Sequence, residues 1–267
     1  MTGDMQIIRS GTGWVVVMDG VAHSWVDPDD PTRLEFGYML RMADYLNTIA
    51  PPRQRMRVIH VGGAAMTMAR YVAAKRPTSP QIVLEPNAEL TRLVRAELPL
   101  AQRSGIKVRP IDGRTGISRM PDDYAKVIIV DAFADATVPA DLVSREFLAD
   151  VDRVLTGDGL VLFNAIDIAP LDWTKRLLAT FATRYAHLTL TAESATLKGR
   201  RHGNLLIAAS HNPLPLDVVI RRAAGSFFPH RVVHSDALDA FIGGAEPFCD
   251  ADAVGSPQVE RGLMHFE

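Results

Sequence analysis

Paired glycines and three acidic residues are the positions in this sequence best suited to chemistry. Gly62 and Gly63 follow an apolar run, and Glu85, Asp112 and Asp131 each end a later one. Paired glycines at a strand-to-helix turn let a ligand approach the backbone, because they carry no Cβ. In an open α/β sheet, the carboxyl ends of neighbouring strands share one crevice. The five residues therefore predict one ligand site at that edge of a parallel sheet.

The first two acids suit a nucleoside. Glu85 ends the strand after the glycines, where an acidic residue typically accepts hydrogen bonds from ribose hydroxyls. The alternative is a solvated carboxylate before Pro86. Asp112 could accept from the exocyclic amine of adenine, with Gly113 leaving room for the ring. Alternatively, Asp112 caps a helix that starts at Arg114.

The third acid, Asp131, follows the strongly apolar run Lys126–Val130. A carboxylate at the end of a central strand is expected to be partly desolvated, which raises its pKa. Such a carboxylate can take a proton from an attacking amine. The alternative is a structural aspartate that accepts from loop amides.

Other polar residues are weaker candidates. His60 is as consistent with a packed strand residue as with a ligand contact, and His23 and Trp25 could cover the crevice or pack on the sheet. The basic run 198–202 is typical of a solvated turn. The histidines lack metal-ligand spacing, so no metal is expected.

Alternating strands and helices position these residues. Continuous Val, Ile and Leu runs indicate a mostly parallel sheet with helices on both faces. The expected strands are 56–61, 81–85, 106–111, 125–131 and 159–164, and the expected helices are 65–76, 87–97, 140–156 and 170–184. Segments 188–191 and 204–209 suggest an antiparallel pair at one edge, followed by a helix near 214–225.

The ends of the chain differ from this pattern. Asp19-Gly20 between two β-rich runs predicts a hairpin over 14–25, and Asp30-Pro31 predicts the start of a helix. We expect an N-terminal β-element with a linking helix (1–50), a nucleoside-binding α/β domain (51–230) and a C-terminal extension (231–267). The tail from about residue 243 is expected to be loosely ordered.

Composition limits the class of protein. The 267 residues are 47% apolar and 22% charged, which is ordinary for a soluble globular chain. The formal net charge of −2 gives no electrostatic reason to expect a nucleic-acid partner. One cysteine, Cys249, favours a reduced cytoplasmic setting, and no apolar run predicts a membrane span.

The order of these motifs resembles spermidine synthase, and most closely the divergent spermidine synthase-like members of that family. The resemblance covers about residues 14–210. It rests on the glycine loop, Glu85, Asp112-Gly113, and the stretch from Val127 to Phe147. Upstream, Asp19-Gly20 and Glu35-Phe36-Gly37-Tyr38 are similar to the hairpin and the Glu-Phe-x-Tyr segment of the family.

The resemblance implies a class I methyltransferase-like (Rossmann-like) α/β domain with an antiparallel edge and a small N-terminal β-element, usually in a homodimer. It implies aminopropyl transfer from decarboxylated S-adenosylmethionine to putrescine, in polyamine biosynthesis. Glu85 would hold the ribose, Asp112 the adenine amine, and Asp131 would deprotonate the attacking amine. Tyr38 would face the acceptor.

The sequence departs from the family pattern at several of these positions. Ala64 and Ala65 replace a glycine and an aspartate in the loop, and His23 replaces a glutamine on the hairpin. The second carboxylate after Asp131 is Asp135, one residue further along than in the family. The substrate contacts expected from the resemblance are therefore Tyr38, Asp135 and His23.

Two other functions remain open. A methyltransferase would use intact S-adenosylmethionine at the same site. The lack of an acid at Ala65 favours this alternative, because an acid there would repel the carboxylate that the intact donor carries. The third hypothesis is a non-catalytic nucleoside-binding protein in which Asp131 is structural.

Overall fold

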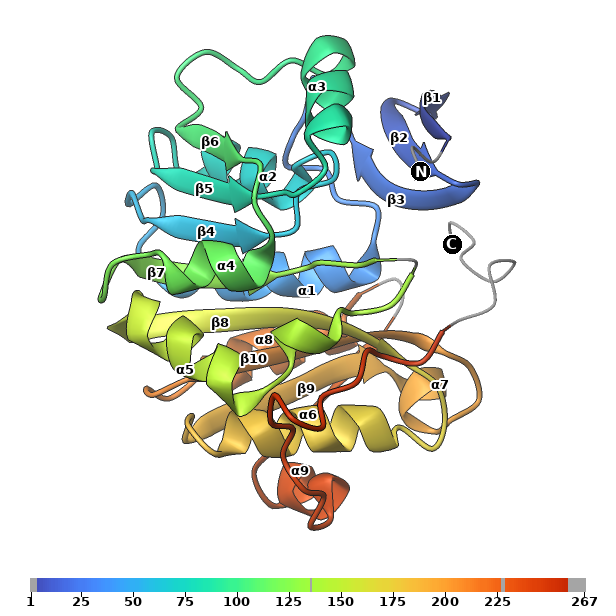
Figure 1. The fold of residues 1–267 in the computed structure, drawn as a ribbon, viewed down its shortest axis with the longest axis vertical. Coiled ribbons are helices and arrows are strands. Elements are labelled where there is room, and N and C mark those ends of the chain that lie inside the picture. Colours follow the sequence, from blue (N-terminus) through green and yellow to red (C-terminus); the bar gives the residue numbers. More distant parts are fainter. Residues whose placement is uncertain (1–3, 135, 227–228, 259–267) are drawn as a thin grey trace.

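The computed structural model describes residues 4–134, 136–226 and 229–258. Figure 1 shows a large sheet between helices, with a small sheet beside one end. The large sheet has eight strands in the order β11-β9-β10-β8-β7-β4-β5-β6. Its parallel strands are β4 (Val58–Val61), β5 (Gln81–Leu84), β6 (Ile106–Arg109), β7 (Ala125–Val130) and β8 (Leu155–Asp167).

Three antiparallel strands extend the sheet beyond β8: β10 (Gly203–Ser210), β9 (His187–Glu193) and β11 (His230–His234). The predicted fold class, a mostly parallel methyltransferase-like sheet with an antiparallel edge, is confirmed. Sequence analysis predicted two of the three edge strands. It missed β11 and the helix that follows, α9 (Ser235–Ile242).

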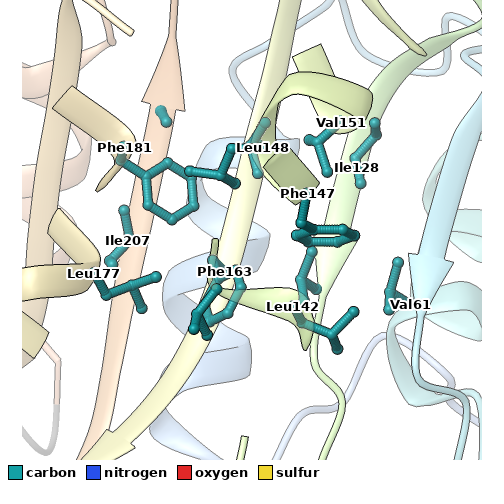
Figure 2. Packing of buried hydrophobic residues seen from close by; sticks show 14 of the residues in the cluster. Val61, Ile128, Leu142, Phe147, Leu148, Val151, Phe163, Leu177, Phe181 and Ile207 are labelled. Atoms are coloured by element: carbon teal, nitrogen blue, oxygen red, sulfur yellow. The ribbon is translucent and has the colours of Figure 1, made fainter. Parts of the chain in front are cut away.

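Helices cover both faces of the sheet. On one face, α4 (Gly113–Ser118), α5 (Arg145–Val154), α6 (Asp172–Ala182) and α9 contribute to one apolar cluster. Figure 2 shows Phe147, Leu148 and Val151 of α5 beside Ile128 and Phe163 of the sheet. The other face carries α1 (Gly37–Leu46), α2 (Thr67–Lys75) and α8 (Leu216–Ala224). The remaining helices are α3 (Ala88–Glu97), the short 3-10 helix η1 (Ala140–Leu142) and α7 (Ser194–Leu197).

Side-chain alternation explains how this core leads into a polar site. Ile129 of β7 and Leu162 of β8 belong to the apolar cluster on the face of the sheet that α1 covers. Successive side chains on a strand point to opposite faces, so the next residues on the same face are Asp131 and Asn164. The strands therefore carry two polar groups just beyond the apolar cluster.

The N-terminal element is a three-stranded antiparallel sheet of β1 (Met5–Ser10), β2 (Gly13–Met18) and β3 (Val21–Val26). The predicted hairpin turn is present, with positive φ at Asp19 and Gly20; β1 was not predicted. Thr67 at the start of α2 donates its hydroxyl to the Trp25 carbonyl at 2.9 Å and lies 2.7 Å from the Ser24 hydroxyl. These bonds fix β3 above the glycine loop.

The helix predicted to open at Asp30-Pro31 starts later, at Gly37. Asp30 Oδ1 accepts from the backbone N–H of Thr32 at 3.0 Å and from its hydroxyl at 2.7 Å. This local turn satisfies the carboxylate, so Asp30 caps a turn rather than a helix.

The tail was expected to be loosely ordered. For residues 243–258 that prediction is wrong, and residues 259–267 lie outside the described residues. The segment 245–258, the C-terminal strap, runs across α5 and α6 (Figure 1). Phe248 is fully buried, and its N–H donates to Thr180 Oγ1 at 2.9 Å. Ser256 exchanges two hydrogen bonds with the backbone of Val138, so the strap holds the loop after β7. A buried aromatic ring and paired backbone groups order this segment.

Candidate active site

One cavity of about 360 Å³ lies at the carboxyl edge of the parallel strands. It spans six neighbouring strands, from Asp112 after β6 to Asn204 on β10. We call the part over β4, β5 and β6 the glycine half. The part over β8 and β10, beneath the start of α1, is the amide half. Asp131, after β7, lies between the two.

Glu85 is bonded to the glycine loop. Its Oε2 accepts from the N–H groups of Gly63 at 2.9 Å and Ala64 at 3.3 Å, and its Oε1 accepts from Asn87 at 2.9 Å. Only 9% of the residue is exposed, so it is not the solvated carboxylate of the alternative interpretation. Each carboxylate oxygen has more than one acceptor direction, so Glu85 can fix the loop and still accept from a ligand.

The two loop glycines are required by close backbone contacts. Gly62 has φ +92°, and a Cβ there would lie 2.2 Å from the carbonyl oxygen of Asp131. A Cβ on Gly63 would lie 3.0 Å from the Cβ of Glu85. Because both residues lack a Cβ, the turn after β4 can pack directly against Asp131 and Glu85. Ala64 and Met66 also have positive φ, which is unusual for residues that carry a Cβ.

Asp112 caps α4: its Oδ1 accepts from the Thr115 N–H at 2.8 Å. This bond lowers the pKa of Asp112 below its ordinary value. The capping interpretation is therefore correct, and the residue also lines the cavity. Gly113 has a packing role that was not predicted, because a Cβ there would lie 2.2 Å from Val61 Cγ1. Gly113 allows α4 to pack on β4, and it also lines the cavity, so its role beside an adenine ring stays a prediction.

Asp131 is held by two side chains from different elements. Asn164 Nδ2 donates to its Oδ1 at 2.8 Å, and Tyr38 Oη donates to its Oδ2 at 3.2 Å. These partners come from β8 and α1, and neither bond involves a loop amide. A carboxylate accepts only, so the amide NH₂ of Asn164 faces it. The buried Asn164 Oδ1 is left without a hydrogen-bond partner.

The electrostatics of this group follow from its position. Burial raises the pKa of Asp131 above the ordinary aspartate value, while the bonds from Asn164 and Tyr38 act in the opposite direction. Burial and the neighbouring Asp131 raise the pKa of Tyr38 well above its ordinary value. Tyr38 therefore stays protonated at neutral pH and remains a donor to the carboxylate.

We predict that the pH profile of activity reports Asp131. The ionised form is needed to accept a proton, so activity falls as pH decreases through the raised pKa. The mutation Tyr38→Phe removes a bond to the charged form, so the acid limb of kcat/KM moves to higher pH. The same raised pKa means that Asp131 favours the folded state at low pH, and this contribution is lost as pH rises through that pKa.

The control for this experiment is Tyr71→Phe. The Tyr71 hydroxyl accepts from Asn47 Nδ2 at 2.8 Å and lies outside the cavity. Loss of this hydroxyl should therefore leave the acid limb of kcat/KM in place. Equal shifts in both variants, or no shift in Tyr38→Phe, would contradict the assignment.

The remaining predicted residues have mixed outcomes. His23 lines the cavity, and burial lowers its pKa, so it is neutral at pH 7. Trp25 is a packing residue, buried with its Nε1 donating to the Ser10 carbonyl at 3.2 Å. His60 lies in the cavity wall, with its Nε2 2.9 Å from Gln81 Oε1. Burial lowers the pKa of His60 to about 4. Asp135 lies outside the described residues.

Apart from Tyr38, sequence analysis did not predict the residues of the amide half. Its walls are mainly apolar, with two side-chain amides; the residues are Phe36, Tyr38, Met39, Asn164, Ile166 and Asn204. One signal was available, because Asn164 interrupts the apolar run 160–166 of a central strand. Asn204 gave no such signal, since it precedes the apolar run of its strand rather than interrupting it.

Comparisons with solved structures support a spermidine synthase-like fold. The chain is similar to a probable spermidine synthase from Corynebacterium glutamicum, with a TM-score of 0.86 and 28% identity over 96% of this chain and 95% of that one. It resembles a spermidine synthase in complex with the transition-state analogue AdoDATO (TM-score 0.59, 15% identity, 92% and 82% coverage). It also resembles human methyltransferase-like protein 13 in complex with SAH (TM-score 0.56, 18% identity, 79% and 93% coverage).

No family model matches the chain, and no curated protein matches it in sequence. The fold defines the general class, a methyltransferase-like α/β domain, and the solved structures that it resembles include transferases. Within that class, the chain has the spermidine synthase-like form of the fold. Among the described residues, no helix is long and apolar enough to cross a membrane.

Proposed function

We propose that this protein binds an S-adenosylmethionine-type nucleoside in the glycine half and transfers an alkyl group to an amine held in the amide half. The preferred donor is decarboxylated S-adenosylmethionine, which makes the reaction an aminopropyl transfer. The resemblance to spermidine synthases implies putrescine as the acceptor. Two of the similar structures are complexes with AdoDATO and with SAH, which supports a nucleoside of this kind.

The glycine half suits such a nucleoside. Gly62 and Gly63 give close access to the backbone, Glu85 offers acceptors to ribose hydroxyls, and Asp112 offers an acceptor to the adenine amine. Among the described residues, no group of three or more His, Cys, Asp or Glu side chains is arranged to hold a metal.

The observation that carries the proposal is Asp131 at the junction of the two halves, with its carboxylate held by Tyr38 and Asn164. An acceptor ammonium there gives a proton to Asp131, and the freed lone pair attacks the propyl carbon bonded to sulfur. The new C–N bond forms as the C–S bond breaks. Sulfur keeps the electron pair, and methylthioadenosine leaves as a neutral thioether.

Calorimetric titration with three ligands tests this function. We expect decarboxylated S-adenosylmethionine and methylthioadenosine to bind, and the intact donor to bind more weakly. No binding of any of the three would exclude all nucleoside hypotheses. Release of methylthioadenosine on addition of an amine would then identify aminopropyl transfer.

Methyl transfer is the second candidate, and one observation favours it. Ala65 is fully buried in the glycine loop and carries no charge, so this position does not repel the carboxylate of intact S-adenosylmethionine. Tighter binding of the intact donor than of its decarboxylated form would support this function. A cytoplasmic homodimer stays a prediction.

A further inference from the structure

The amide half differs from the glycine half in its charge. Among the described residues that line the cavity, the carboxylates are Glu85, Asp112, Asp131 and Asp141. Glu85 and Asp112 follow β5 and β6, and Asp141 lies beside α4, where Arg114 donates to its carbonyl at 3.2 Å. Asp131 is thus the described carboxylate that borders the amide half.

The neighbourhood of Asp131 can bind one ammonium group. Asn164 Oδ1 is buried in a residue that is only 1% exposed, and it has no partner. Because Tyr38 donates its proton to Asp131, its oxygen can still accept. A primary ammonium has three N–H bonds, and Asp131, Asn164 and Tyr38 offer three acceptors for them.

Further from Asp131, the described residues of the lining are neutral. Ile166 follows Asn164 on the same face of β8, and Asn204 of β10 is its partner in the antiparallel ladder. Phe36 and Met39 lie opposite, at the start of α1. Strand spacing places the β10 side of the cavity roughly 10 Å from the β7 side. A second ammonium at this distance would be desolvated against apolar groups and an uncharged amide, which is costly.

We propose that the acceptor is a primary monoamine, with its nitrogen at Asp131 and Asn164 and a neutral, largely apolar remainder toward Ile166 and Asn204. This inference rests on the proposed transfer to an amine. It changes the acceptor class from the diamine that the resemblance implies.

The test compares n-pentylamine with 1,4-diaminobutane, in which an ammonium replaces the terminal methyl group. With decarboxylated S-adenosylmethionine as donor, methylthioadenosine release should show a kcat/KM at least about tenfold higher for n-pentylamine. A preference for the diamine would overturn the inference. If that preference disappears in Asp135→Asn, the second ammonium is bound at Asp135.

A gain-of-charge variant sharpens the test. Asn204→Asp keeps the side-chain shape and adds a carboxylate, so it should shift the ratio of kcat/KM values toward the diamine by about tenfold or more. The control is Asn212→Asp, the same charge change at an exposed turn beyond the other end of β10. An unchanged ratio in Asn204→Asp, with an unchanged melting temperature, would contradict the placement of the acceptor tail.

Binding separates failure of this inference from failure of the proposed function. Both amines are titrated calorimetrically into the protein saturated with methylthioadenosine. Tighter binding of n-pentylamine without turnover would support the acceptor class and contradict the transfer. Turnover with preference for the diamine would support the transfer and contradict the acceptor class. If neither methylthioadenosine nor either amine binds, both the acceptor class and the proposed transfer are overturned.

Discussion

The mutation Asp131→Asn should lower kcat for group transfer by roughly a thousandfold, since a positioned general base contributes about 10²–10⁴ in rate. The amide cannot take the proton of an acceptor ammonium, while its size is almost that of the carboxylate. Binding of methylthioadenosine should stay nearly unchanged, because the nucleoside contacts come from the glycine half. Single-turnover release of methylthioadenosine measures the first quantity, and calorimetry measures the second.

Asp167→Asn is the matched control for this variant. Asp167 is also a buried aspartate at the end of a strand, and burial raises its pKa. Its Oδ2 accepts from the backbone and hydroxyl of Thr174, at 2.9 and 2.7 Å. This substitution should reduce stability but leave the rate per folded molecule close to that of the parent. If Asp131→Asn turned over at the parental rate, the assignment of Asp131 as the base would be wrong.

The mutation Gly62→Ala should have the second large effect, on both stability and nucleoside binding. A Cβ at φ +92° is strained, and it would also lie 2.2 Å from the carbonyl oxygen of Asp131. Together these effects should lower the free energy of unfolding by about 3 kcal/mol. Because the loop must move away from Asp131, the Kd for methylthioadenosine should rise about tenfold or more.

Gly157→Ala is the control, because a Cβ at Gly157 has no neighbour within 4 Å and φ lies outside the strained range. It should change stability by less than about 0.5 kcal/mol and leave nucleoside binding unchanged. Denaturant melts measure stability, and calorimetry measures the Kd. Equal effects in the two variants would show that the close contact between Gly62 and Asp131 is unimportant.

Much of the fold was predictable because its signals are local. Continuous apolar runs identified the five parallel strands, and the hairpin turn at Asp19-Gly20 followed from residues that tolerate positive φ. The errors came from competing local or tertiary interactions. Asp30 satisfies its side chain in a turn, and β11 and the C-terminal strap are stabilised by contacts distant in sequence, such as Phe248 with Thr180.

The sequence by itself placed Gly62, Gly63, Glu85, Asp112 and Asp131 along one edge, because parallel strands must share their carboxyl ends. Only the tertiary structure showed what these residues contact. In that structure, Asp131 accepts hydrogen bonds from Tyr38 and Asn164. The tertiary structure also brought Asn204 into the same cavity. Such neighbours depend on the order and register of strands distant in the chain, and these are set by packing of the whole sheet rather than by any local pattern.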